Sequence, residues 1–340
     1  MRGTVVDDQY RIERVLGEGG MGTVYVARDL RLDRDVALKL AHERSPQALA
    51  RSTREALVLA RLSHPNVVAI YQVGVYDQWL YVAMEYVRGM TARAWTAEPR
   101  TVREILAVYI AVGEGLAAAH RAGVVHHDFK PDNVIVGDDG RARVLDFGLA
   151  RTATDSERGN RIAGTPGYMA PEQQRGDAID HRADQYAFCA SLWEAMHHSL
   201  PYDSDAVRTL SLGTVETSQP TTEPLVMTTR VPKLGKPSVP LPRHVEAALK
   251  RGLSDDREQR WPEMAPLLEE LRRDPSRARK RVAAIAGGIA IVAGAGVAVA
   301  WPAHREDPCR VGPDLIARTW SAEHRAQVAT QLANHAPAWL

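Results

Sequence analysis

Residues 124–133 read V-V-H-H-D-F-K-P-D-N, and this stretch decides the fold. It places Asp128, Lys130 and Asn133 at spacings of two and five, directly after two β-branched apolar residues. A short apolar strand that feeds a turn can present these three side chains on one surface. The trio suits phosphoryl transfer, because it offers a carboxylate to orient a hydroxyl, an ammonium group to neutralise a phosphate, and an amide oxygen to hold a metal.

The stretch resembles the catalytic loop of protein kinases, H-R-D-x-K-x-x-N, although His127 stands where the family has an arginine. Thirteen residues after Asn133, Asp146 opens a D-F-G triplet at the interval between a kinase's two metal ligands. This triplet argues against phosphotransferases of the aminoglycoside type, whose second metal motif is D-x-D. The resemblance implies that Asp128 accepts the proton of a substrate hydroxyl and that Lys130 neutralises phosphate charge. It also implies that Asn133 and Asp146 hold Mg²⁺, with Mn²⁺ as an alternative.

Upstream, residues 10–29 contain two alternating runs around a glycine cluster, which predicts a hairpin with a flexible tip. The G-x-G-x-x-G spacing lets backbone N–H groups approach phosphates, although a plain Gly-rich hairpin would look the same. A Rossmann unit is disfavoured because Thr23 and Val24 continue a strand instead of opening a helix. The resemblance implies that this loop covers ATP through Leu16, Gly17, Glu18, Gly19, Gly20, Met21, Gly22 and Val24.

The next short strand, 36–39, ends in a cation. A lone lysine at a strand end is usually a solvated surface residue. The distance from the Gly-rich hairpin instead makes Lys39 resemble the kinase lysine that holds the α- and β-phosphates. The resemblance also places Ala37 in the ATP site.

Such a lysine needs an acidic partner. Residues 47–62 have helical periodicity and place Glu55 on one face with Leu59 and Leu62. We therefore expect Glu55 to be the partner. Glu43 is the alternative, but it precedes the helix.

Two further strands are predicted at 67–75 and 79–87, joined by a turn. The second ends A-M-E-Y-V-R-G and resembles the hinge between kinase lobes. The resemblance implies that the backbone of Glu85 and Val87 binds adenine, and it places Ile135 in the same pocket. Taken alone, the segment is better explained as an edge strand that enters a glycine turn.

Residues 149–172 end G-T-P-G-Y-M-A-P-E and resemble the activation segment of kinases. The resemblance implies that Thr165, with Lys130, marks specificity for serine and threonine. It also implies that Arg260, in R-W-P-E-M, pairs with Glu172 of the A-P-E triplet.

Other segments complete the expected order of elements. A long amphipathic helix is predicted over 102–122 and is closed by Gly123. Asp184 is predicted to open an apolar helix, 186–196. Residues 205–242 are rich in threonine and proline, which predicts an irregular segment with one short helix at most.

Composition excludes several classes of protein. The chain has 340 residues, of which 45% are hydrophobic and 25% charged, and its net charge is +1. This balance gives no general attraction to nucleic acid, so no nucleic-acid partner is expected. The two cysteines, Cys189 and Cys309, form no metal-binding pattern. The amino terminus lacks the apolar core of a signal peptide.

A second unit is expected after the kinase-like region. Residues 272–281 carry six basic residues and one acidic residue, and 282–301 contain no charge. Twenty helical residues span about 30 Å, the thickness of the hydrocarbon core of a bilayer. A buried core helix is the alternative, but the basic flank and Trp301 at the end favour a membrane span.

The charge asymmetry also predicts the orientation. The positive-inside rule keeps the kinase-like region in the cytoplasm, with a single pass through the cell (inner or plasma) membrane. Small residues at four-residue spacing within 282–301 could pair two helices into a homodimer. The tail, 302–340, is too short for a core of its own, has helical character over 314–334, and carries Cys309, which could bridge two chains.

The sequence therefore predicts an α+β, two-lobed protein-kinase fold followed by one transmembrane helix. The expected divisions are a kinase domain at 10–273, a basic juxtamembrane segment at 274–281, a transmembrane helix at 282–301 and an extracytoplasmic tail at 302–340.

The expected function is transfer of the γ-phosphate of ATP to serine or threonine of protein substrates, including itself, in membrane-linked signalling. The alternatives are a membrane-anchored pseudokinase that binds nucleotide without turnover and a sensor whose main task lies outside the membrane. Completeness of the set Lys39, Asp128, Asn133 and Asp146 favours the enzyme, and the short tail disfavours the sensor.

Overall fold

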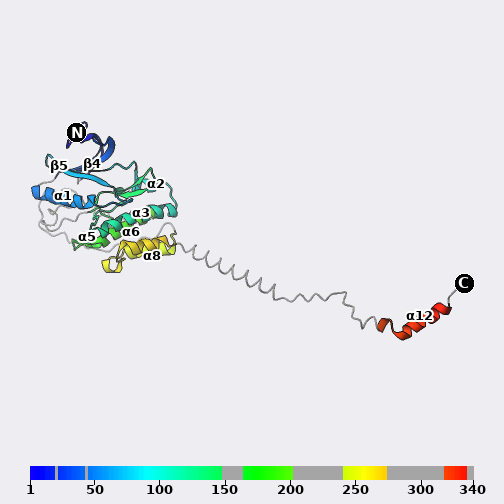
Figure 1. Ribbon diagram of the computed structural model, residues 1–340. Coiled ribbons are helices and arrows are strands. Elements are labelled where there is room, and N and C mark those ends of the chain that lie inside the picture. Colours follow the sequence, from blue (N-terminus) through cyan, green and yellow to red (C-terminus); the bar gives the residue numbers. More distant parts are fainter. Residues whose placement is uncertain (20–21, 43–44, 148–163, 202–239, 274–317, 335–340) are drawn as a thin grey trace. The chain divides into compact units, whose positions relative to one another are not determined.

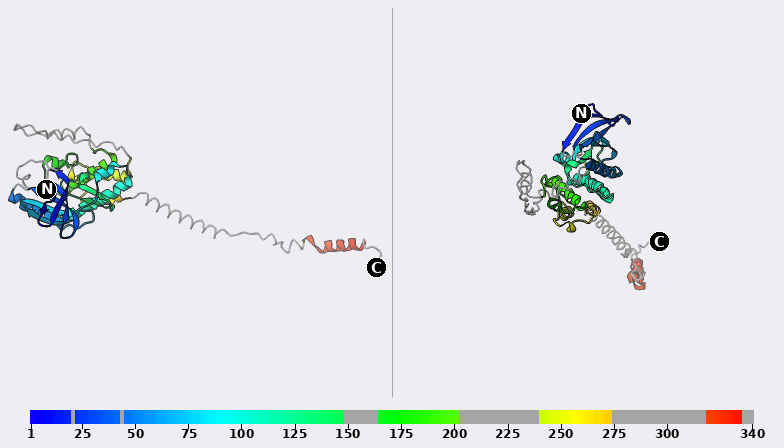
Figure 2. Two further views of the ribbon diagram at one scale, coloured as in Figure 1. Left: turned by 90° about the horizontal axis from the view of Figure 1, so that it is seen from above. Right: turned by 90° about the vertical axis from the view of Figure 1, so that its left-hand side faces the viewer.

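The computed structural model describes residues 1–19, 22–42, 45–147, 164–201, 240–273 and 318–334. The chain divides into two compact units, Met1–Arg273 and Asp274–Leu340, and each is described by itself. Figure 1 follows the first unit from blue strands at its amino terminus to yellow helices at its end. Most strands gather in one half of this unit and most helices in the other, as the right-hand view of Figure 2 shows.

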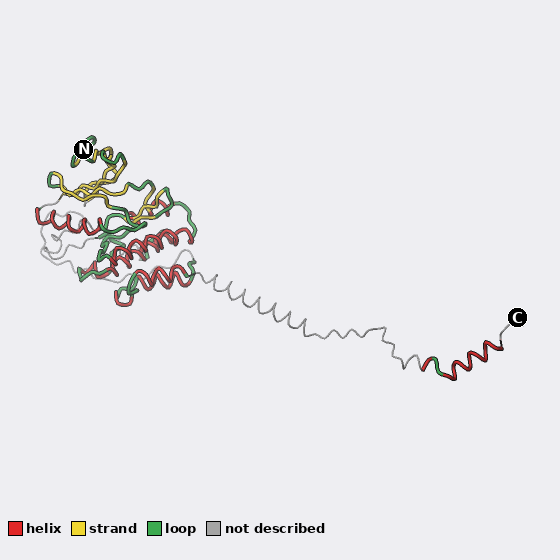
Figure 3. Tube along the Cα trace, viewed as in Figure 1, coloured by secondary structure: helices red, strands yellow, loops and turns green. Residues whose placement is uncertain are grey.

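The amino-terminal lobe is built on an antiparallel sheet with the strand order β1-β2-β3-β4-β6-β5. Its strands are β1 (Val5–Val6), β2 (Tyr10–Gly19), β3 (Gly22–Asp29), β4 (Arg34–His42), β5 (Ile70–Tyr76) and β6 (Trp79–Glu85). Helix α1 (Pro46–Ala60) packs against β5 and β6 (Figure 3). Ser45 caps α1 by accepting the N–H of Ala48 at 3.2 Å, and Pro46 occupies the first turn, where no N–H is needed.

Two hairpins of this sheet lie where the sequence predicts them. In the β2–β3 hairpin Gly19 pairs with Gly22, and the tip, 20–21, lies outside the described residues. In the β5–β6 hairpin the predicted turn is confirmed. Its two central residues, Asp77 and Gln78, have φ of 46° and 68°, the left-handed conformation that matches the twist of paired strands.

Both predicted strands of this second hairpin are too long. Strand β5 begins at Ile70 because the residues before it pair elsewhere: Val67 bridges Val144, and the Val68 N–H donates to the Val144 carbonyl at 3.0 Å. Strand β6 ends at Glu85, and the chain then crosses to the second lobe. The segment at 67–68 therefore ties the two lobes together.

The second lobe is mostly helical. Its elements are α2 (Ala92–Ala97), α3 (Val102–Arg121), α5 (Pro171–Arg175), α6 (His181–His197), α8 (Arg243–Gly252), α9 (Met264–Arg272) and the 3₁₀ turns η1 (Pro131–Asn133) and η2 (Arg257–Gln259). Helix α6 is buried along nearly its whole length, and both α3 and α8 pack against it. The first unit therefore has the expected two lobes, the first rich in strands and the second mostly helical.

Capping explains where the two long helices begin and end. Thr101 and Glu104 form a reciprocal capping box at the start of α3, and Gly123 follows its end with φ of 77°. Helix α6 begins at His181 because Asp180 caps it by accepting the N–H of Arg182 at 2.8 Å. The prediction that Asp184 opens this helix is therefore wrong by one turn.

Close packing joins α6 to α8. The thiol of Cys189 is fully buried against Gly252, where an added Cβ would collide with the sulfur. Burial raises the pKa of the Cys189 thiol, so it behaves as a small apolar group.

A small sheet carries the catalytic loop. It consists of β7 (Gly89–Thr91), β8 (Val134–Gly137) and β9 (Ala142–Val144) in the order β7-β8-β9. Because β7 directly follows the crossing segment and β8 directly follows η1, the sheet places the lobe connection beside the residues 124–133.

Several predictions fall outside the described residues. They concern most of 205–242, most of the activation segment and all of 282–301. Among the helices of the described part, none is both long and apolar enough to cross a membrane. In the second unit the structure describes α12 (Ala322–Asn334), which lies within the range 314–334 predicted to be helical, and the start of that range falls outside the described residues.

Candidate active site

The catalytic loop is held by one buried carboxylate. The Oδ atoms of Asp184 accept the backbone N–H groups of His126 at 2.7 Å and of His127 at 2.8 Å. His120 Nε2 lies 2.8 Å from Asp184 Oδ2. Burial alone would raise the pKa of Asp184, but hydrogen bonds from His120 and the His126 N–H, with electrostatic interaction with both histidines, outweigh burial and lower it.

Aromatic packing fixes the loop from the other side. The ring of His126 lies 5.7 Å from that of Phe129 and 4.8 Å from that of Phe147, measured between centroids. His126 Nε2 also lies 2.8 Å from the Leu145 carbonyl oxygen. The loop and the segment that contains Asp146 therefore form one packed body.

Asp128, Lys130 and Thr165 form a closed set of contacts. Lys130 Nζ lies 3.0 Å from Asp128 Oδ2 and donates to Thr165 Oγ1 at 2.7 Å. Thr165 donates to Asp128 Oδ1 twice, from its backbone N–H at 2.9 Å and from its hydroxyl at 2.8 Å. The carboxylate that the sequence assigns to a substrate hydroxyl thus already binds a hydroxyl.

The two predicted metal ligands come from neighbouring segments. Asn133 Nδ2 donates to the Asp128 carbonyl at 2.8 Å, which leaves the amide oxygen for another role. The N–H of Leu145 donates to the Asn133 carbonyl at 2.8 Å and so brings Asp146 beside Asn133. An amide oxygen and a carboxylate are ligands that Mg²⁺ and Mn²⁺ accept, with phosphate and water as further ligands, so the donor set fits such a metal.

Lys39, on β4 of the first lobe, contacts one of the two predicted metal ligands, Asp146. Its ammonium is nearly buried, with 5% of the residue exposed, and lies 2.8 Å from Asp146 Oδ1. Glu55 lies on α1 as predicted, but its side chain is outside the described part of the structure. The pair of Lys39 and Glu55 therefore stays a prediction.

The described residues that the resemblance assigns to ATP binding lie on β2, β3, β4 and β8 and at or after the end of β6, and their role stays a prediction. Gly22 has φ of 119° and an added Cβ would collide with the Leu40 carbonyl, so only glycine fits there. Leu16 is 42% exposed, and Ala37 is buried on the strand paired with β3. Gly17, Glu18 and Gly19 are exposed, Val24, Val87 and Ile135 are partly buried, and Gly20 and Met21 lie outside the described residues.

The structure restricts how the backbone of Glu85 could contact adenine. The N–H of Glu85 donates to the Ala69 carbonyl at 2.8 Å, so any adenine contact from this residue has to use its carbonyl. Its carboxylate lies 3.0 Å from Nε of Arg143, whose side chain is 5% exposed and also binds Asp139 at 2.7 Å. Sequence reasoning missed Arg143, although an arginine in the apolar run A-R-V was a usable signal.

A second missed group surrounds η1. Arg93 of α2 donates to both carboxylate oxygens of Asp132, to Glu194 at 2.8 Å and to the hydroxyl of Tyr168 at 2.7 Å. These contacts join α2, η1, α6 and the segment before α5 in one network. Nothing in the local pattern around Arg93 predicts its partners.

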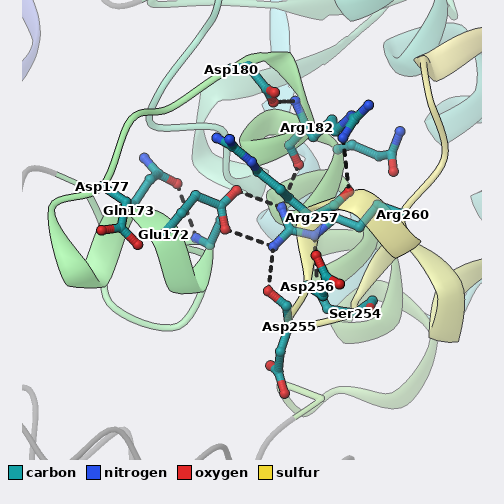
Figure 4. A network of polar contacts seen from close by, with 12 residues as sticks. Glu172, Gln173, Asp177, Asp180, Arg182, Ser254, Asp255, Asp256, Arg257 and Arg260 are labelled. Atoms are coloured by element: carbon teal, nitrogen blue, oxygen red, sulfur yellow. Dashed lines mark hydrogen bonds and ion pairs between the residues drawn. The ribbon is translucent and has the colours of Figure 1, made fainter.

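The predicted pair of Arg260 and Glu172 is confirmed. Two parallel hydrogen bonds of 2.7 and 2.8 Å join them, and both side chains are buried (Figure 4). Arg260 also donates to the carbonyls of Ser254 and Arg182. The network fixes the A-P-E end of the segment that begins at Thr165.

Comparison with known proteins agrees with this geometry. A family model described as "Protein kinase domain" matches residues 10–267. Pkn3 of Myxococcus xanthus, a serine/threonine-protein kinase, is 38% identical over 60% of this chain and 40% of that protein. PrkC of Bacillus subtilis is 35% identical over 64% and 35% of the two chains, and PknB of Mycobacterium tuberculosis 37% over 59% and 34%.

A solved structure is also similar. The kinase domain of Mycobacterium tuberculosis PknI matches with a TM-score of 0.57 and 26% identity, covering 80% of this chain and 97% of that one. The chain spans less than half the length of the three curated relatives named above. With its family model covering most of the sequence, the chain belongs to the protein kinase family, among the bacterial Hanks-type serine/threonine kinase domains.

Proposed function

We propose that the chain transfers the γ-phosphate of ATP to serine or threonine of protein substrates, itself included. The observation that carries this proposal is the hydroxyl of Thr165, which donates to Asp128 at 2.8 Å while it accepts from Lys130 at 2.7 Å. A substrate hydroxyl needs the same two partners, an acceptor for its proton and a cation beside its oxygen.

Each residue then has a role in the reaction. Asp128 orients the hydroxyl and accepts its proton, and Lys130 offsets charge on the transferred phosphate. Lys39 holds the nucleotide phosphates from the first lobe. Asn133 and Asp146 would hold Mg²⁺, or Mn²⁺ in its place, and a bound metal would neutralise charge on the phosphate oxygens.

Phosphate incorporation into the full chain tests the proposal. With [γ-³²P]ATP and Mg²⁺ we expect labelled phosphoserine or phosphothreonine, and Asp128→Asn should lower the initial rate by about 10²–10⁴-fold. The matched control is Asp138→Asn, which makes the same change on the β8–β9 turn. Nucleotide binding without label transfer in the wild type would support the pseudokinase alternative instead. Phosphoproteomics of cells with wild type or Asp128→Asn would name the substrates.

We also propose that residues 282–301 anchor the chain in the cell membrane, with the kinase domain in the cytoplasm. The support is the uncharged run of twenty residues and the basic segment before it. The full chain should resist carbonate extraction from membranes, whereas a chain that ends at Arg273 should not. A reporter fused after Leu340 that behaves as cytoplasmic would contradict the orientation. Crosslinking in membranes would test the homodimer.

A further inference from the structure

Gln173 connects the A-P-E segment to the catalytic loop. It lies on α5, next to Glu172 (Figure 4), and is buried, with 4% of the residue exposed. Its Oε1 accepts the N–H of Ala170 at 3.1 Å, and its Nε2 donates to the carbonyl of His127 at 2.8 Å. Both ends of the amide are therefore used, one within its own segment and one in the residue before Asp128.

The carbonyl that Gln173 holds belongs to a residue in an uncommon conformation. His127 has φ of 68°, in the left-handed region that few residues other than glycine adopt. Its N–H is fixed by Asp184, as described above, and its carbonyl is fixed by Gln173. The two contacts hold the two peptide groups that flank the Cα of His127, the second of which leads into Asp128, and so set the direction in which the Asp128 side chain leaves the backbone.

We propose that Gln173 is a positioning residue for phosphoryl transfer, which it serves by fixing the His127 carbonyl and through it Asp128. The inference rests on the proposed kinase activity. Because Glu172 is locked to Arg260, Gln173 ties the catalytic loop to a rigid point of the second lobe. The bond to His127 requires a donor at Nε2. The contact with the N–H of Ala170, which caps the start of α5, requires an acceptor at Oε1. An amide supplies both and an ionised carboxylate does not.

If Gln173 no longer positions Asp128, the maximal rate of phosphoryl transfer should fall while the affinity for ATP stays the same. No hydrogen bond of Gln173 involves Lys39, Asn133 or Asp146. A misplaced reacting group lowers the rate by up to about 100-fold even when the substrate still binds. The maximal rate should therefore fall while KM for ATP stays nearly constant.

Two variants separate the two bonds. Gln173→Glu keeps the acceptor for Ala170 and removes the donor to His127, whereas Gln173→Met removes both. The neighbouring residue supplies matched controls: Gln174 Nε2 donates to the Met169 carbonyl at 3.0 Å, away from the catalytic loop, so Gln174→Glu and Gln174→Met make the same chemical changes there.

The measurements are the initial rate of autophosphorylation of the full chain as a function of ATP concentration, and the melting temperature. We expect both Gln173 variants to lose about 10- to 100-fold in maximal rate, with KM for ATP within about twofold of wild type, while both Gln174 variants keep the wild-type rate. A wild-type rate in Gln173→Glu would assign the effect to the cap alone and overturn the inference. So would an equal loss in the Gln174 variants, or failure of both Gln173 variants to fold, which would make the residue purely structural. An inactive wild type would contradict the proposed function itself.

Discussion

Two cation–carboxylate pairs in this molecule differ in how far their carboxylates are buried. Arg260 and Glu172 have exposed side-chain fractions of 0% and 3%, and the guanidinium also donates to backbone carbonyls. The side chain of Lys39 is 6% exposed but that of its partner Asp146 is 33% exposed, and a single contact of 2.8 Å joins them. The pair of Arg260 and Glu172 is closed to solvent, so its role is to stabilise the fold. The second keeps an open carboxylate beside its cation, which is what a site for phosphate and metal requires.

Breaking the closed pair should have the largest effect. In Arg260→Met the carboxylate of Glu172 stays buried without its partner, which should lower the free energy of unfolding by about 3–5 kcal/mol. Urea unfolding of the full chain measures this. The double variant Arg260→Met/Glu172→Met should recover much of the loss, because no buried charge remains. A double variant that is less stable than the single one would contradict this account.

Breaking the open pair should separate activity from stability. Lys39→Met should lower the autophosphorylation rate by about 10²–10³-fold, because a preorganised cation for phosphate is lost. Its free energy of unfolding should change by less than about 1 kcal/mol, since water can reach Asp146. Lys250→Met, which breaks the exposed pair with Glu246, is the control for loss of a lysine. If Lys39→Met kept its activity but lost much of its free energy of unfolding, the pair of Lys39 and Asp146 would be structural and not part of the phosphate site.

The carboxylate of Asp184 is a second closed group and should respond to acid. Its pKa is lower in the folded chain than the ordinary value of about 3.9. Its contribution to stability is therefore complete above that ordinary value and is lost as the pH falls through the folded pKa. Urea unfolding should show wild type more stable than Asp184→Asn by about 1–3 kcal/mol at pH 7, and this difference should shrink below about pH 4. If wild type and Asp184→Asn differed in free energy of unfolding by the same amount at pH 7 and pH 3, the lowered pKa of Asp184 would be contradicted.

The smallest effect should come from the activation segment. An arginine before Asp128 could clamp a phosphorylated loop with two parallel bonds, but His127 has one shorter arm and cannot. Replacement of Thr152, Thr154 and Ser156 by alanine should therefore lower the rate less than about tenfold.

The same triple replacement in a His127→Arg background provides the comparison. A large loss there and not in the wild-type background would identify His127 as the residue that weakens dependence on loop phosphorylation. A large loss in the wild-type background would show that the loop controls activity despite His127.

The sequence predicts those parts of the site that depend on fixed spacing. Asp128, Lys130 and Asn133 lie in one loop, so their order alone brings them together, and the D-F-G interval adds Asp146. Contacts between distant polar residues were not predictable in this way. The bonds of Gln173 to His127 and of Arg143 to Glu85 join residues 46 and 58 positions apart, and no local periodicity records them.

Errors in the predicted elements have a similar origin. The start of α6 is set by the side chain of Asp180, and apolar periodicity alone does not register a cap. The start of β5 is displaced because Val67 and Val68 pair with the second lobe instead of continuing the hairpin. The starts of α6 and β5 are therefore set by single contacts that the pattern of apolar residues does not reveal.

The packing of Cys189 against Gly252 restricts how the two helices can change over evolution. A larger residue at position 252 meets the sulfur, so it becomes acceptable only after the partner has shrunk. The reverse order is open, because a smaller side chain at position 189 merely leaves a void. Substitutions at the two positions are therefore expected to arise in a fixed sequence, first on α6 and then on α8, and related chains should seldom carry a bulky residue at both.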